Sequence, residues 1–279
     1  MKKAVEIPEC YSELTTKQYK YLLRKFWLIM YDDSIDTLDI QRDMADYLLG
    51  RRKFINPYKR EQYLILVNEV ATTLSWLFEE RDNQLQLAFD TTYNLIPKFG
   101  KYLGPQSHGV DLRFGEFRTA SDIMMQYKDD DDTDILDALV GVLYRKPNKG
   151  INRPSFDGNF REPFNKHHIE RYADRVHHLP DVYKYGIYLW FANFCQFLIS
   201  GEFNIEGRDI SFSPIFGTGT KSDSDTKQTE DKLGMLSILF TLADAGTFGN
   251  VEQTDNAPLL DVMCKLLNDY NTAKNMNAK

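Results

Sequence analysis

The segment from Leu233 to Leu267 constrains the fold of this chain more than any other part of the sequence. It reads LGMLSILFTLADAGTFGNVEQTDNAPLLDVMCKLL, and its apolar residues recur at the spacing of two helices joined by a short turn. We expect these helices at Thr229–Ala243 and Pro258–Tyr270. Their apolar face is too continuous for a freely exposed segment, and their polar residues are too scattered to form a site. The segment therefore predicts packing rather than catalysis.

Seven apolar side chains of this helix pair form a candidate partner surface. Together they offer more apolar area than a hairpin of two helices can bury on itself. Two arrangements follow: the pair docks on a helix that we expect at Val182–Ser200, or it binds a partner protein through spaced apolar anchors. The seven residues are Leu236, Leu239, Phe240, Leu259, Val262, Leu266 and Leu267.

The rest of the sequence also predicts a mostly α protein, a multi-helix globular domain with one small β-hairpin. In Asn83–Asp90 apolar residues alternate with polar or small ones, which predicts a strand. We expect this strand to pair with a second one at Leu112 and Phe114. Helical spacing predicts the other helices, which are Thr16–Ile29 after a cap at Thr15 or Thr16, Thr37–Leu49, Pro57–Phe78, Gly115–Tyr127, Ile135–Tyr144, Lys166–His178 and Val182–Ser200.

The predicted domain organisation depends on one change in the sequence pattern near residue 80, from helical spacing to strand-like alternation. A chain of 279 residues is long enough for one large domain or two small ones. The change divides it into an N-terminal helical region, residues 1–80, and a main helical domain, residues 81–279, unless the chain forms a single domain. Lys146–Pro163 and Phe203–Asp231 are predicted loops. Within the second loop Phe216–Gln228 is predicted to be mobile, because glycine, serine and charged residues leave few apolar anchors.

Charge, cysteine content and hydropathy exclude several classes of function. The net charge is −7 and the isoelectric point about 5.3, which argues against broad nucleic-acid binding because that needs a basic surface. The 3 cysteines are odd in number and widely spaced, so we expect a reducing compartment and no disulfide framework. The apolar stretch Tyr185–Ile199 is shorter than the roughly 20 residues of a membrane span. It predicts a buried core helix and no membrane association.

Four histidines form the most tempting catalytic or metal-binding group. His167, His168, His177 and His178 all fall in the predicted helix Lys166–His178. On that helix His167 and His178 share a face but lie roughly 16 Å apart, which is too far for a common metal ion. A local pair would need ligands from other elements. A surface helix with unrelated histidines is the simpler interpretation.

Two further motifs fail the spacing tests for ion or nucleotide binding. The run Asp129–Asp137 resembles part of a calcium loop, but Ile135 stands where glycine is required and Gly141 where glutamate is required. Gly217–Ser222 resembles a phosphate-binding loop, but Thr220 interrupts the glycine–lysine order of the Walker pattern. We therefore expect no cofactor, no structural metal and no catalytic residue.

One region of the chain is locally basic. It begins at a predicted helix end and continues into the loop that follows, and it consists of Arg145, Lys146, Lys149, Arg153 and Arg161. Cations at a helix C-terminus complement the helix dipole and need no further role. The region is either a solvated loop or a contact surface for an acidic partner.

Three parts of the sequence together carry a resemblance to a known family. They are Phe114–Phe117 (FGEF), Leu143–Arg145 (LYR), and the C-terminal pair Thr247–Gly249 (TFG) and Pro258–Val262 (PLLDV). The chain resembles tail-assembly proteins of phages and prophages of gut bacteria, which are encoded with the tail tube and the tape measure and include proteins assigned as tape-measure chaperones. The resemblance spans Leu95–Leu267, and the aspartate run, the Gly217–Lys227 loop and the first eighty residues lie outside its pattern.

The resemblance implies a non-enzymatic protein of tail assembly or structure that acts through helix-surface contacts. Its partner would be a tape-measure or other tail protein, and its location the cytoplasm of the host cell or the virion. Another virion component, such as a connector or cargo protein, is the first alternative. A metal-dependent hydrolase that uses the His167–His178 helix with distant acidic residues is the second.

Overall fold

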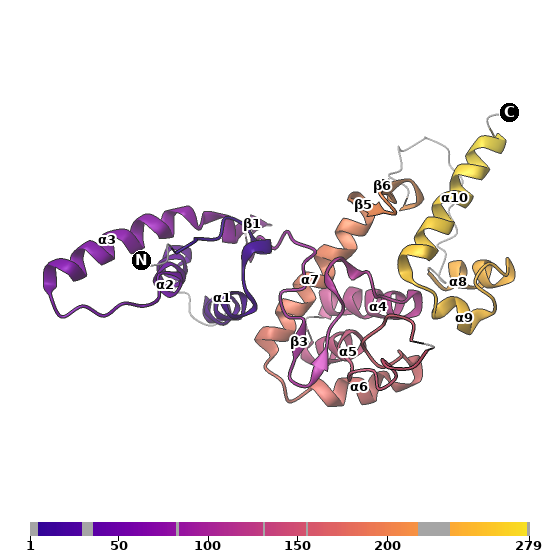
Figure 1. Cartoon of the computed structure of the whole chain (residues 1–279), viewed down its shortest axis with the longest axis horizontal. Coiled ribbons are helices and arrows are strands. Elements are labelled where there is room, and N and C mark those ends of the chain that lie inside the picture. Colours follow the sequence, from indigo (N-terminus) through magenta and orange to yellow (C-terminus); the bar gives the residue numbers. More distant parts are fainter. Residues whose placement is uncertain are drawn as a thin grey trace. The chain divides into compact units, whose positions relative to one another are not determined.

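The structure is a computed structural model, in which residues 5–29, 36–81, 84–130, 132–154, 156–216 and 235–277 are described. These residues form mainly helices, which confirms the predicted mostly α fold (Figure 1). They also form three two-stranded antiparallel sheets, so short hairpins are more numerous than expected. The chain divides into two compact units, Met1–Ile96 with Leu179–Asn193, and Pro97–His178 with Phe194–Lys279.

The first unit is built on three helices and an aromatic core. The Asp36 and Asn56 side chains accept hydrogen bonds from backbone N–H groups in the first turns of α2 (Thr37–Leu48) and α3 (Pro57–Thr73), as N-caps do. The Tyr11 hydroxyl donates to the Leu77 carbonyl at 2.6 Å, and the Trp190 indole donates to the Thr92 carbonyl at 3.0 Å. These bonds satisfy the polar atoms of large buried rings. The elements are α1 (Thr16–Ile29), α2 (Thr37–Leu48), α3 (Pro57–Thr73), β1 (Phe78–Arg81), β2 (Gln84–Leu87) and the N-terminal part of α7 (Asp181–Ser200).

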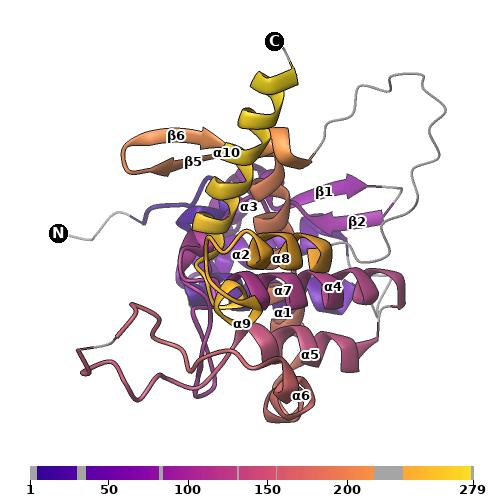
Figure 2. The same ribbon diagram turned by 90° about the vertical axis from the view of Figure 1, so that its right-hand side faces the viewer.

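The second unit surrounds one apolar helix, α5. Leu136, Leu139, Val140 and Leu143 of this helix are fully buried, and α4 lies beside it (Figure 2). The helices of the unit are α4 (Phe114–Asp130), α5 (Thr133–Leu143), α6 (Ile169–Val176), the C-terminal part of α7, α8 (Met235–Asp244), α9 (Val251–Asp255) and α10 (Leu259–Asn277). Its strands are β3 (Lys98–Phe99), β4 (Tyr102–Leu103), β5 (Glu202–Ile205) and β6 (Arg208–Ser211).

A glycine sets the distance between α5 and α6. A Cβ atom on Gly141 would lie 2.5 Å from the carbonyl carbon of Tyr172, which is closer than real Cβ contacts. Only glycine therefore allows the backbones to approach this closely. Tyr172 and Val176 of α6 are buried, so one face of this short helix is held firmly against its neighbour.

The strand pairing and the end of one helix in the first unit differ from the sequence predictions. The strand expected in Asn83–Asp90 exists as β2, but it pairs with β1 rather than with Leu112 and Phe114. Phe114 instead begins α4. The helix predicted to reach Phe78 ends at Thr73, and a 3₁₀ turn at Ser75–Leu77 then leads into the first strand of this hairpin at Phe78. Apolar residues in a short segment fit both the spacing of a helix and the spacing of a strand, so spacing alone did not distinguish helix from strand here.

The C-terminal part of the second unit also differs from expectation. The predicted loop Phe203–Asp231 contains the hairpin of β5 and β6. The helices α8 and α10 are separated by α9 rather than by a short turn, and Asn250 with Gln253 forms a capping box at its start. The predicted helix Pro258–Tyr270 continues to Asn277. Apart from Phe216, the segment predicted to be mobile, Phe216–Gln228, lies outside the described residues.

The predicted domain boundary near residue 80 stays a prediction. The first compact unit continues past it to Ile96 and takes up Leu179–Asn193 from later in the chain. Among the helices in the described part of the chain, none combines the length and the apolar character needed to cross a membrane.

Candidate functional site

Segments that are distant in sequence meet at the start of α4. The Phe114 N–H donates to the Ala257 carbonyl at 3.0 Å, and the Leu259 N–H donates to the Leu112 carbonyl at 2.9 Å. The Arg118 guanidinium lies 3.2 Å from the Asp255 carboxylate in α9. These contacts join the start of α4 to the C-terminal segments, and both regions belong to the family resemblance.

A buried ionic cluster centres on Glu116, in the first turn of α4. Arg145 binds its carboxylate through two bonds of 2.9 and 3.1 Å, one to each oxygen. Arg161 also binds both oxygens, and its Nη2 atom lies 3.2 Å from Oε2. The side chains of Glu116, Arg145 and Arg161 are 0%, 0% and 1% exposed. Bidentate hydrogen bonds between a guanidinium and a carboxylate are among the strongest and most geometrically specific hydrogen bonds in proteins.

The remaining donors of the two arginines find partners inside the second unit. Arg145 Nε donates to the Glu162 carbonyl at 2.8 Å. Arg161 Nε donates to the Asp111 carboxylate at 3.1 Å, and its Nη1 donates to the Leu143 carbonyl at 2.9 Å. The arginines therefore tie the loop before α4, the end of α5 and the predicted loop Lys146–Pro163 to one carboxylate.

The charge state of Glu116 follows from two opposing effects. Burial raises the pKa of its carboxyl, but the charges of Arg145 and Arg161, and their hydrogen bonds, outweigh that effect and hold the pKa below its ordinary value. Glu116 is thus ionised at neutral pH and balances part of the charge of the two guanidiniums. A charge removed from this cluster would leave uncompensated ions in a dry interior.

This cluster corrects the prediction for the basic region. Arg145 and Arg161 do contact acidic groups, but those groups are Glu116 and Asp111 of the same chain. Both arginines are buried and are not available to an acidic partner. Lys146, Lys149 and Arg153 are exposed. Sequence spacing did not distinguish the buried from the exposed basic residues, because the acidic residues that pair with the two arginines lie elsewhere in the chain.

The seven residues of the candidate partner surface divide by burial. Leu239, Leu259 and Val262 are buried in the second unit. Leu266 and Leu267 are partly exposed. The side of α8 that carries Leu236 and Phe240 faces solvent, with these residues 36% and 48% exposed.

The docking of this helix pair on Val182–Ser200 stays a prediction, whereas the packing of α8 and α10 against other helices of the unit is defined. The closest packing of α10 is against α4 and the short helix Ser213–Phe216, and that of α8 is against α9. On α8, Leu239 and Leu242 point into this packing and are 1% and 2% exposed. Leu236 and Phe240 are one helical turn apart on another face. The helix therefore carries two apolar faces, of which one is buried.

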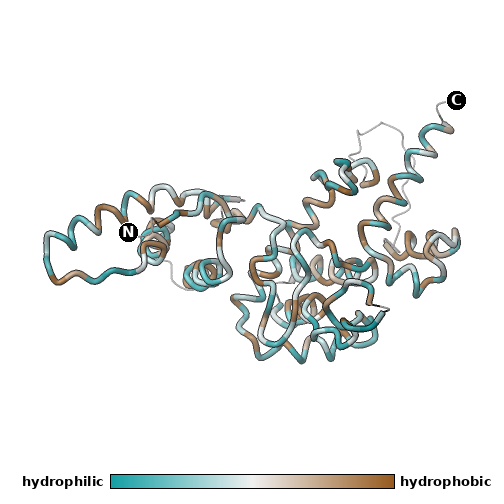
Figure 3. The backbone as a smooth tube through the Cα atoms, viewed as in Figure 1, coloured by the Kyte–Doolittle hydropathy of each residue, from teal (hydrophilic) through white to brown (hydrophobic). Residues whose placement is uncertain are grey.

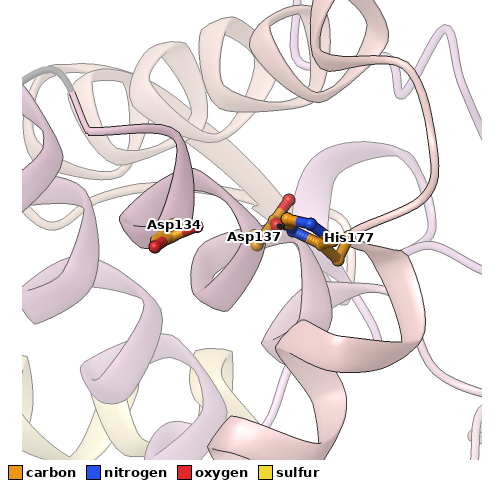
Figure 4. Close-up of side chains that lie close together, drawn as sticks. All are labelled: Asp134, Asp137 and His177. Carbon is orange, nitrogen blue, oxygen red and sulfur yellow. Dashed lines mark hydrogen bonds and ion pairs between the residues drawn. The ribbon is translucent and has the colours of Figure 1, made fainter.

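The histidines are not on one continuous helix. Lys166–His168 is a 3₁₀ turn, α6 covers Ile169–Val176, and His177 follows as its C-cap. His177 Nδ1 lies 2.7 Å from Asp137 Oδ2 of α5, and Asp134 lies nearby on the same helix (Figure 4). One donor atom from each of these three residues lies within 4.8 Å of the others.

The other predicted histidine ligands lie apart from this group. His167 lines a pocket of about 440 Å³ together with polar and apolar residues near α9, among them Phe164, Lys166 and Glu252. Its neighbour Lys166 lies 3.9 Å from Asp255. In the part of the chain that the structure describes, Asp134, Asp137 and His177 are the one group of three metal-ligating side chains close enough to share an ion.

A scan against models of known protein families found no match, and searches of curated proteins and of solved structures found no similar protein.

Proposed function

We propose that the chain is a non-enzymatic tail-assembly protein of a phage or prophage, which binds a tape-measure or other tail protein through apolar helix surfaces. The observation that carries the proposal is the second apolar face of α8, formed by Leu236 and Phe240. Apolar anchors spaced four residues apart are the contacts by which one helix binds in the groove of a partner. The resemblance of three segments to tail-assembly proteins supplies the class of partner.

Three of the segments that carry the resemblance meet around α4. Of the segments that carry it, Phe114–Phe117 and Leu143–Arg145 meet through the ion pair of Glu116 and Arg145. Pro258–Val262 meets the same place through the hydrogen bond between Leu259 and Leu112. The sequences of segments that bind one another in the protein interior are constrained together, because a change in one segment leaves buried polar groups of another without hydrogen-bond partners.

The exposed face of α8 is suited to a protein partner. A leucine or phenylalanine gains about 1.5–3 kcal/mol on full burial, and here a pair of such residues remains partly in water on one helix face. Single exposed apolar residues are ordinary. Two on the same face, on a helix whose neighbouring face is buried through Leu239 and Leu242, present an apolar surface on a fixed helix.

The helix α3 of the first unit provides a second apolar surface. Its apolar side chains are not gathered on one face, and in Figure 3 hydrophobic and hydrophilic segments alternate along it. Leu64, Ile65 and Leu66 are 50%, 54% and 41% exposed, whereas Val67 is buried. A helix that is apolar on more than one side is typical of a helix that packs on more than one side.

A substitution on the exposed face of α8, with an exposed control on α10, tests the proposal. The full chain is co-expressed with the tape-measure protein of the same genome, and the complex is measured by size-exclusion chromatography with light scattering. Phe240→Asp should leave the circular dichroism melt unchanged and abolish the complex, because a charge would face the partner. Met276→Asp, at a site 72% exposed on α10, should keep both the melt and the complex.

Leu239→Asp is the matched buried variant, and it should unfold the protein. A buried unpaired charge costs several kcal/mol, against a total stability of about 5–15 kcal/mol. The proposal is wrong if the wild-type chain forms no complex with the tape-measure protein, or if folded Phe240→Asp binds it as tightly as the wild type does. A complex with a connector instead would support the alternative virion role.

A further inference from the structure

Asp134, Asp137 and His177 are brought together by the packing of two helices in the second unit. Asp134 and Asp137 are three residues apart in α5, so their side chains lie on one face of that helix. His177 directly follows Val176, the last residue of α6, which is 0% exposed. Burial of Val176 therefore fixes the backbone position from which the imidazole reaches α5.

The approach of the imidazole does not depend on its own polar contact. Gly141 allows the backbone of α6 to lie against α5, and Tyr172, which is 3% exposed, anchors the same face of α6. These apolar and backbone contacts place the end of α6 over the first turns of α5. A ligand group that is held by the scaffold in this way is pre-organised for binding.

The donor atoms lie near, but not at, the spacing that one metal ion requires. His177 Nδ1 and Asp137 Oδ2 are 2.7 Å apart, and one ligand atom from each of the three residues lies within 4.8 Å of the other two. Bonds of about 2.0–2.2 Å to zinc place neighbouring ligand atoms roughly 3–4.4 Å apart. Rotation of the side chains would bring the three groups to this geometry, because two of them are exposed and can turn about their χ angles.

The exposure of the group leaves an entry path. The His177 side chain is 71% exposed and that of Asp137 is 4% exposed, and Asp134 is also exposed. One ligand is thus anchored in the protein while two face solvent (Figure 4). Water would complete the coordination, as it does where a protein supplies three ligands.

We propose that Asp134, Asp137 and His177 bind one divalent transition-metal cation, with Zn²⁺ as the best-fitting ion. An imidazole nitrogen with carboxylate oxygens is a donor set that zinc and its neighbours accept, whereas Mg²⁺ and Ca²⁺ prefer oxygen ligands alone. The ion would join α5 to the end of α6. The proposal departs from our expectation of no structural metal, which rested on histidines and aspartates considered along the sequence and not across helices.

An ion pair between His177 and Asp137 is the rival interpretation, and Asp134 separates the two. The ion pair needs only His177 and Asp137, whereas the metal site also uses Asp134. Asp134→Asn therefore weakens metal binding and leaves the ion pair intact. His178, exposed and next in the chain to His177, provides a control for adventitious binding of zinc to surface imidazoles.

Isothermal titration of the full chain with ZnCl₂ tests the proposal, with circular dichroism to show that each variant is folded. We expect one equivalent of Zn²⁺ on the wild type and on His178→Ala. Asp134→Asn and His177→Ala should each bind at least tenfold more weakly, and MgCl₂ should give no comparable heat.

A thermal melt provides the second readout. Zinc binds only the folded chain at this site, so it should raise the Tm of the wild type and of His178→Ala. The rise should be lost in Asp134→Asn. Absence of stoichiometric zinc binding to the wild type would overturn the proposal, and so would unchanged zinc affinity in folded Asp134→Asn and His177→Ala.

Discussion

Two ionic clusters in the second unit both pair carboxylates with basic side chains, but they differ in the basic residue and in their access to water. Around Glu116, a carboxylate and two guanidiniums are 0–1% exposed and bind one another. Around Asp137, a nearly buried carboxylate meets an imidazole that is 71% exposed. Arginine is always charged and has no lone pair to offer, whereas neutral imidazole can bind a metal. Burial and residue type together make the first cluster a structural link and the second a candidate site.

The largest effect should follow from a single change at the centre of the buried cluster. Glu116→Gln keeps the size of the side chain but leaves Arg145 and Arg161 without their shared counter-charge. Breaking a buried pair in this way costs about 3–5 kcal/mol. Urea unfolding should show this loss, and Glu252→Gln, an exposed change in the same unit, should alter stability by no more than about 0.5 kcal/mol. Equal stability of the two variants would show that the buried cluster does not hold the fold.

The pH dependence of stability should show the same cluster. The folded state lowers the pKa of Glu116, so the ionised form stabilises the protein above the ordinary pKa of about 4.3. This contribution decreases as the pH falls from there through the lower folded pKa. Thermal melts between pH 7 and pH 3 should give a steeper acid loss for the wild type than for Glu116→Gln, since glutamine has no proton to gain. Parallel curves would contradict the assignment.

The smallest effect should come from the exposed cluster. His177→Ala removes a mostly exposed imidazole, and ion pairs with an exposed member contribute about 0.2–1 kcal/mol. We expect the urea midpoint without metal to fall only slightly, with His178→Ala as the matched control. A loss as large as that of Glu116→Gln would show that His177 is a structural link like the arginines.

The sequence predicted the helices and the basic residues of the buried cluster, but not which side chains pair with one another. Helical spacing gave the approximate ranges of α4 and α5, because a buried apolar stripe leaves a regular pattern. Arg145 and Arg161 were found as a basic region, and Glu116 fell in a segment of the family resemblance. Their partnership spans 29 and 45 residues of sequence. Local spacing carries no signal for contacts of this length.

The same limit explains the histidines. A single helix from Lys166 to His178 predicts that His167 and His178 share a face. The chain instead breaks into a 3₁₀ turn and α6, and the useful neighbour of His177 lies on α5. Gly141 was the available signal, since a glycine inside an apolar helix often marks a close approach of another backbone. It did not reveal which helix would approach.

Urea unfolding of wild type, Glu116→Gln and Asp134→Asn, each with and without Zn²⁺, tests most directly the claim that one cluster holds the fold and the other binds. We expect Glu116→Gln to lose about 3–5 kcal/mol without zinc and still to gain stability from zinc. Asp134→Asn should match the wild type without zinc and lack the gain. The account is contradicted if Glu116→Gln is as stable as the wild type, or if zinc stabilises Asp134→Asn as much as the wild type.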